Sequence, residues 1–187
     1  MGVLLAASVD AFFCEMVRSS LSERGFEASE TTEYYLVSLL GEYAKGRISD
    51  EPLSLRLAEA NRSDDPSIEV QTLKEVGDTS LYVAGFFSES LERKLVQVDY
   101  YVGIGRTAYA SLAQRLSSSG AGDVYGELSD KFPRFVEVLT GVRSKVHLCT
   151  DPGKLFERWK RTGSKALESK LRGLGIVLPS NGEAAVC

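Results

Sequence analysis

Leu81–Tyr109 reads LYVAGFFSESLERKLVQVDYYVGIGRTAY and contains two dense clusters of aromatic residues. Large aromatic side chains bury more area than other residues and dominate the energetics of cores and interfaces. A charged residue, Asp99, lies inside the second cluster. We therefore expect this stretch to form either the middle of the core or the wall of a site. Its aromatic residues are Tyr82, Phe86, Phe87, Tyr100, Tyr101 and Tyr109.

Hydrophobic residues on both sides of this stretch recur at helical spacing, and residues typical of helix ends separate them. Ser29 is expected to cap one helix at its N-terminus, and Gly25 to end the helix before it. Pro133 is expected to kink a later helix or mark its true start, and Gly141 to end it. The expected helices cover residues 8–24, 29–46, 53–61, 68–88, 98–116, 123–141 (or 129–141) and 154–172, with a loop over 117–122.

The chain has 187 residues, of which 43% are hydrophobic and 26% charged, and these values fit one globular domain. We predict an all-α, single-domain bundle of about six or seven helices. Residues 1–150 are expected to form the helical core, 151–178 an appended basic amphipathic element, and 179–187 a frayed tail.

Charge is distributed unevenly along the chain, whose formal net charge is -4. Residues 154–172 hold seven basic and two acidic residues, a local net charge of +5, so the rest of the chain is acidic. The segment could contact a nucleic-acid backbone or an acidic membrane surface. A solvated helix whose long basic side chains cover apolar surface is the favoured alternative. The candidate basic surface is Lys154, Arg158, Lys160 and Arg161.

The cysteines and the N-terminus bear on the compartment. Cys14, Cys149 and Cys187 are odd in number and far apart, a pattern that favours a reducing compartment over a disulfide framework. The N-terminal MGVLLAASV lacks the basic residues of a signal peptide, and Asp10 interrupts its apolar run. No apolar run approaches the length of a membrane span. We expect a cytoplasmic protein with no membrane span.

Val96–Ala108 can be read as a strand, a Gly-x-Gly-x-x-Ala turn and a helix, the pattern that binds dinucleotides. The context argues against it, because no apolar strand precedes Asp123 and no other alternation of strands and helices follows. We favour close helix packing at Gly103 and Gly105, and we expect no cofactor.

His147 is the only histidine, and it lies two residues from Cys149. A closed zinc site needs four ligands, and a Cys–His catalytic pair needs a third group to orient it. We expect no metal site here and treat both residues as ordinary, partly buried side chains.

The best polar and aromatic grouping surrounds Asp99 and Arg106. With an aromatic wall it could receive a small polar ligand, whereas a buried charge held by its neighbours could equally fix the register of the helices. We favour the structural reading and expect Tyr101 to lie in the core. The candidate ligand-binding residues are Tyr82, Phe86, Asp99, Tyr100, Tyr101 and Arg106.

Several short motifs resemble a family of bacterial all-helical cytoplasmic proteins. They are GD at 77–78, LYV at 81–83, GFF at 85–87, VDYY at 98–101 and AY at 108–109. The resemblance covers roughly residues 10–140 and leaves the basic segment outside. It implies a stand-alone bacterial protein, and it brings no activity and no catalytic residue with it.

The sequence favours a non-enzymatic helical adaptor or regulatory protein that binds a protein partner or itself as a homo-oligomer. One alternative is a small-ligand-binding protein or enzyme with an aromatic pocket around Asp99–Arg106. Another is a nucleic-acid-associated protein that binds through residues 154–172.

Overall fold

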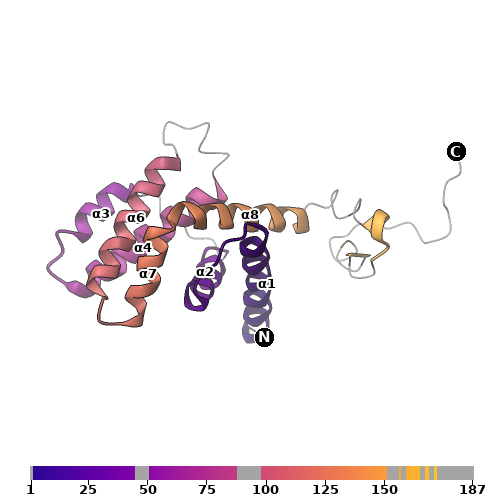
Figure 1. Cartoon of the computed structure of the whole chain (residues 1–187), viewed down its shortest axis with the longest axis horizontal. Helices are drawn as coiled ribbons and strands as arrows, with labels where there is room; N and C mark the ends of the chain where they lie inside the picture. Colours follow the sequence, from indigo (N-terminus) through magenta and orange to yellow (C-terminus); the bar gives the residue numbers. More distant parts are fainter. Residues whose placement is uncertain are drawn as a thin grey trace, which may run out of the picture. The chain divides into compact units, whose positions relative to one another are not determined.

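The computed structural model describes residues 2–44, 51–87, 98–150, 156, 159–164, 167–168 and 171. Up to residue 150, these residues form seven helices and no strand, so the predicted all-α fold is confirmed (Figure 1). The helices are α1 (Gly2–Glu23), α2 (Glu30–Tyr43), α3 (Leu53–Ala60), α4 (Pro66–Phe86), α6 (Val98–Arg115), α7 (Gly120–Asp130) and α8 (Phe132–Thr150).

The end signals at the α1–α2 turn act as the sequence predicts. Gly25 has a φ of 55°, a left-handed conformation that glycine adopts without a steric penalty, and it ends α1. Ser29 caps α2, because its hydroxyl accepts a hydrogen bond from the backbone N–H of Thr32 at 3.2 Å. Pro133 is the second residue of α8 and therefore marks the start of that helix.

Two predicted boundaries were wrong. The loop expected over 117–122 is shorter, because α7 already begins at Gly120. Gly141 does not end a helix, since α8 continues to Thr150. Gly141 instead leaves room for α1, because a Cβ atom at this position would lie 2.5 Å from a guanidinium nitrogen of Arg24 and closer still to the hydroxyl of Ser20.

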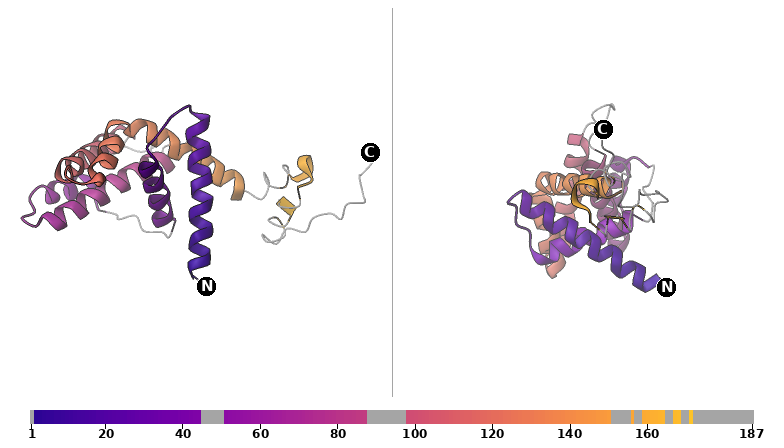
Figure 2. Two further views of the ribbon diagram at one scale, coloured as in Figure 1. Left: turned by 60° about the horizontal axis from the view of Figure 1, so that its bottom comes forward. Right: turned by 90° about the vertical axis from the view of Figure 1, so that its right-hand side faces the viewer.

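The core is centred on α4, which packs against α2, α3 and α6, while α6 also packs against α7. The α1–α2 pair adjoins this group (Figure 2). It is joined to α8, where the Ser20 hydroxyl donates to the Val138 carbonyl at 2.8 Å. Among the described residues of Met1–Arg143, the largest fully buried side chains are Tyr109, Phe132, Phe135, Leu36, Leu40, Leu73, Leu81, Leu112, Leu128 and Leu139.

Glycines allow close packing at three points in the core. A Cβ atom on Gly77 would lie 2.5 Å from Cε1 of Tyr109, and one on Gly85 would lie 2.5 Å from Cβ of Leu139. Gly105 faces the ring of Phe132 in the same way. Gly103 and Gly105 lie within α6 and not in a strand-to-helix turn. Close helix packing is therefore confirmed at Gly105 but was wrong for Gly103, where nothing lies within 4 Å of an added Cβ atom.

The chain divides into two compact units, Met1–Arg143 and Ser144–Cys187, with the division inside α8. In the second unit, Trp159 and Leu171 are buried, and Phe156 and Leu167 pack against them. The helical turn that contains Trp159 ends before Gly163, which has a φ of 61°. Residues 179–187, expected to fray, lie outside the described residues.

Candidate interaction groove

The predicted aromatic site is split between two places, the first of which is on α4. The ring of Tyr82 stacks on Tyr43 of α2, with centroids 4.5 Å apart, and on Phe86 at 4.7 Å. The Tyr43 hydroxyl lies 2.8 Å from that of Thr79, and burial raises the pKa of Tyr43 to about 12. Tyr82 and Phe86 thus help to hold α2 on α4.

The remaining predicted residues lie at the start of α6. Tyr100 and Tyr101 contact each other edge to face at 5.3 Å, Asp99 is exposed, and Tyr101 is partly buried, so placing Tyr101 in the core was wrong. Arg106 Nε donates to the Ser129 carbonyl at 3.2 Å, a contact between α6 and α7. Among the described residues, no hydrogen bond, ion pair or ring contact joins this group to Tyr82 or Phe86. The described structure therefore does not bring the six residues together.

The basic surface is described in part. Lys160 and Arg161 are exposed, as expected for solvated side chains, and the Lys160 ammonium lies 5.4 Å from the centre of the Phe156 ring. Lys154 and Arg158 lie outside the described residues, as do the side chains of His147 and Cys149. The described side chains include no group of three or more His, Cys, Asp or Glu residues that could hold a metal ion.

Asp78, on α4, is the most buried carboxylate among the described residues. Asp78 is 3% exposed, and its Oδ1 accepts hydrogen bonds from the hydroxyls of Tyr35, at 2.5 Å, and Tyr109, at 2.8 Å. Its Oδ2 lies 2.7 Å from the ammonium of Lys74, one turn earlier. The ring of Tyr125 packs on both tyrosine rings. One carboxylate thus connects α2, α4 and α6.

Burial raises the pKa of Asp78, while the Lys74 ammonium and the two tyrosine hydroxyls oppose that rise by stabilising the ionised form. Burial and the nearby carboxylate raise the pKa of Tyr109 as well. Among the described residues, no buried side-chain nitrogen or oxygen of this cluster lacks a hydrogen-bond partner. This arrangement links α2, α4 and α6.

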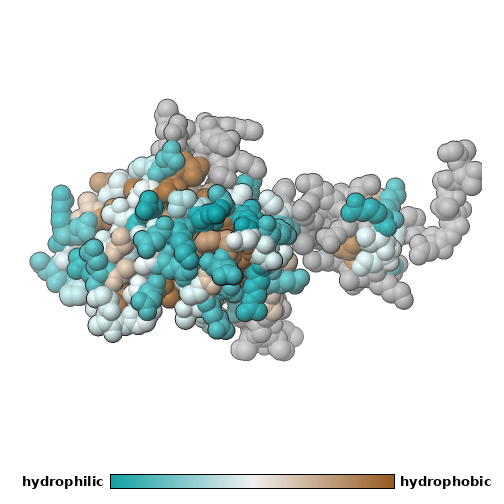
Figure 3. Space-filling model, in the orientation of Figure 1, coloured by the Kyte–Doolittle hydropathy of each residue, from teal (hydrophilic) through white to brown (hydrophobic). Residues whose placement is uncertain are grey.

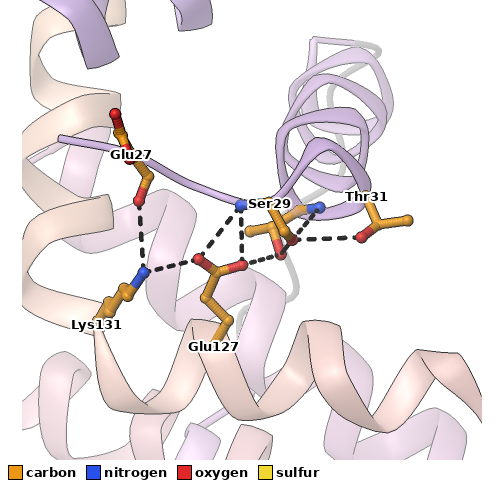
Figure 4. A network of polar contacts seen from close by, with 6 residues as sticks. Glu27, Ser29, Thr31, Glu127 and Lys131 are labelled. Atoms are coloured by element: carbon orange, nitrogen blue, oxygen red, sulfur yellow. Dashed lines mark hydrogen bonds and ion pairs between the residues drawn. The ribbon is translucent and has the colours of Figure 1, made fainter.

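A second network ties α2 to α7 (Figure 4). Both carboxylate oxygens of Glu127 accept from the backbone N–H of Ser29, and one accepts from the Thr32 hydroxyl at 2.7 Å. Lys131 binds the other oxygen at 2.9 Å. Burial raises the pKa of the Glu127 carboxyl, but these hydrogen bonds outweigh it and hold the pKa at about 2. A negative charge near the N-terminus of a helix interacts favourably with the positive end of the helix dipole, so Glu127 stabilises the start of α2.

A groove of about 300 Å³ lies between α1 and α2. The helices run antiparallel there, because Arg18 pairs with Glu33 at 3.3 Å while Asp10 lies beside Gly41 at the other end of α2. We call this feature the α1–α2 groove. It is lined by Asp10, Ala11, Cys14, Val17 and Arg18 of α1 and by Glu30, Glu33, Tyr34 and Val37 of α2.

The floor of the α1–α2 groove is apolar and its rim is charged. Val17 and Val37 are buried at its base, whereas Tyr34 is 74% exposed, the highest value among the large hydrophobic residues described. A second hollow of about 330 Å³ adjoins the groove towards the α1–α2 turn, with Phe26 in its lining. Arg18 and Glu33 line both hollows, so their ion pair lies between them. The sequence analysis did not identify this groove.

Comparisons of the chain with protein-family models, with characterised proteins and with solved structures gave no match. The family resemblance noted above therefore remains an expectation from the sequence. Among the described residues, no helix is both long and apolar enough to cross a membrane.

Proposed function

We propose that this chain is a non-enzymatic helical interaction protein and that its α1–α2 groove receives a helix of a protein partner. The observation that carries the proposal is the groove itself, with an apolar floor beside an exposed tyrosine. Tyrosine is enriched among the residues that dominate binding energy at protein interfaces. The face seen in Figure 3 is mostly hydrophilic with smaller apolar patches, as expected of a surface on which only limited areas bind.

The spacing of the lining residues favours a helical partner. Residues 10, 11, 14, 17 and 18 form one stripe on α1, and residues 30, 33, 34 and 37 form one stripe on α2. Such i, i+3, i+4 and i+7 stripes are the faces that antiparallel helices present to a third helix. Amphipathic helices dock into hydrophobic grooves by this geometry in a recurring mode of recognition.

The test is a photo-crosslinking amino acid at position 34 of the full chain, expressed in the cells that make it. The matched control carries the same group at position 55, because Leu55 on α3 is also exposed, at 60%. We expect position 34 to crosslink to one discrete protein, and the crosslink to disappear when Ala11→Trp fills the groove. Equal crosslinking at both positions, persistence in Ala11→Trp, or no crosslink at position 34 would contradict the proposal.

A further inference from the structure

We infer that the partner helix is basic, with Lys or Arg residues on both sides of its apolar anchors; this inference rests on the proposed function. Among the described residues, the rim of the α1–α2 groove carries the carboxylates of Asp10, Glu30 and Glu33 and one cation, Arg18. Arg18 pairs with Glu33, which leaves Asp10 and Glu30 without an ion pair to any described residue. Two negative charges therefore remain on the rim of an apolar groove.

The position of the two carboxylates sets the spacing of the partner's cations. Asp10 lies beside Gly41 near the end of α2, and Glu30 is in the first turn of α2. Eleven residues of helix separate positions 30 and 41, or about 16 Å at 1.5 Å per residue. A helix lying along the groove would meet both carboxylates with basic residues about three turns apart. Its apolar residues between them would face Val17, Tyr34 and Val37.

Long-range electrostatics favour the same class of partner. The unit Met1–Arg143 contains fourteen basic and twenty-two acidic residues, a formal net charge of -8. A field of this sign accelerates association with cationic partners and disfavours acidic ones.

Two other candidate occupants fit the α1–α2 groove less well, namely a second copy of the chain and the chain's own basic segment. A second copy docking groove to groove would place two sets of rim carboxylates against each other, which costs free energy. In the chain's own basic segment, the described Phe156 and Leu167 already pack on the buried Trp159 and Leu171 within the second unit. A basic amphipathic helix from another protein has neither conflict.

The test is a displayed library of amphipathic helices with apolar residues at i, i+3, i+4 and i+7 and random residues elsewhere. The library is selected on the full chain and depleted on Ala11→Trp, so that only groove-dependent binders remain. We expect these binders to be enriched in Lys and Arg about three turns apart. As free peptides, they should bind Asp10→Asn/Glu30→Gln about tenfold more weakly than the wild type and lose affinity between 50 and 500 mM salt.

Glu59→Gln on α3 is the matched control, because it removes an exposed carboxylate outside the groove lining and should leave binding unchanged. Groove-dependent binders with no excess of basic residues would overturn the inference while leaving the proposed function in place. Self-association of the chain that Ala11→Trp abolishes would overturn it too, because the occupant would then be a second copy. A library without any groove-dependent binder would overturn both proposals.

Discussion

The hydroxyl of Tyr109 on α6 donates a hydrogen bond of 2.8 Å to the carboxylate of Asp78 on α4. Tyr109 is fully buried and Asp78 is 3% exposed, so this bond forms out of contact with water. The Tyr35 hydroxyl of α2 donates to the same oxygen at 2.5 Å. Hydrogen bonds to buried charged groups are among the strongest in proteins. The bond between Tyr109 and Asp78 is therefore expected to matter for the register of all three helices.

Tyr109→Phe keeps the ring and removes the hydroxyl, so one donor to the buried carboxylate is lost. We expect the free energy of unfolding to fall by about 1.5–3 kcal/mol, as for other hydrogen bonds to charged groups. Urea unfolding followed by circular dichroism measures the change. Tyr34→Phe, at an exposed tyrosine, is the control and should unfold like the wild type. Equal stability of Tyr109→Phe and the control would show that the bond contributes nothing.

Tyr109, and not Tyr101, is the core tyrosine whose substitution should destabilise the fold most. Tyr109→Ala should cost about 3–5 kcal/mol, because it empties a fully enclosed site. Tyr101 is only partly buried, so Tyr101→Ala should cost about 1 kcal/mol. Differential scanning calorimetry of the two variants compares them directly. A larger loss at position 101 than at position 109 would reverse this assignment.

Gly77 and Gly103 form a matched pair of helical glycines in different surroundings. A Cβ atom at position 77 would press on the enclosed ring of Tyr109, so Gly77→Ala should destabilise the protein by about 1–3 kcal/mol. Nothing lies within 4 Å of a Cβ atom at position 103. Gly103→Ala should therefore stabilise α6 by about 0.5–1 kcal/mol, the ordinary benefit of alanine in a helix. Thermal unfolding shifts of the same sign in both variants would contradict this contrast.

The Glu127 network predicts a dependence of stability on pH. The folded pKa of about 2 lies below the ordinary value of 4.5, so the ionised carboxyl stabilises the fold above pH 4.5 and loses that effect as the pH falls towards 2. Glu127→Gln should therefore lower the free energy of unfolding at pH 7. The expected loss is only about 1–2 kcal/mol, because solvent screens the charge of a group near the surface. The difference from the wild type should shrink as the pH approaches 2.

Glu137→Gln is the control for this series. Glu137 is an exposed carboxylate on α8 that forms a long ion pair of 3.5 Å with the exposed Arg134. Urea unfolding at pH 7, 4 and 2.5 should show little effect of this substitution at any pH. If the free energies of unfolding of Glu127→Gln and the wild type differ by the same amount from pH 7 to 2.5, the carboxylate of Glu127 does not act as an ionised cap.

The parts of the fold that the sequence predicts correctly depend on neighbours along the chain. Ser29 and Gly25 act within one helical turn, and their residue types suit those positions whatever the tertiary structure. Gly141 has the same residue type as Gly25, but it lies within α8 opposite Ser20 and Arg24. Its role depends on α1, more than a hundred residues earlier, so a local pattern could not distinguish a helix end from a packing site.

The sequence analysis missed both the Asp78 cluster and the α1–α2 groove for a related reason. Nothing near Asp78 in the sequence shows that Tyr35 and Tyr109 converge on it, because they lie 43 and 31 residues away. In the predicted helix over 68–88, Asp78 lies on the face opposite the apolar stripe, where a charged residue is ordinary, so the pattern gave no signal. The α1–α2 groove gave no signal either. Val17 and Val37 would be ordinary core residues in any amphipathic helix, and only the arrangement of the helices leaves a hollow above them.

The contact of Glu127 with Ser29 means that one wall of the groove, the start of α2, is fixed by a residue outside the groove. Glu127 secures the first turn of α2, and that same turn presents Glu30 and Glu33 to the groove. A substitution in α7 that removes this contact should therefore fray the start of α2. The amide hydrogens of α2 would then exchange faster with deuterium. Variation at position 127 would thus tune the proposed partner binding without altering any residue that lines the groove.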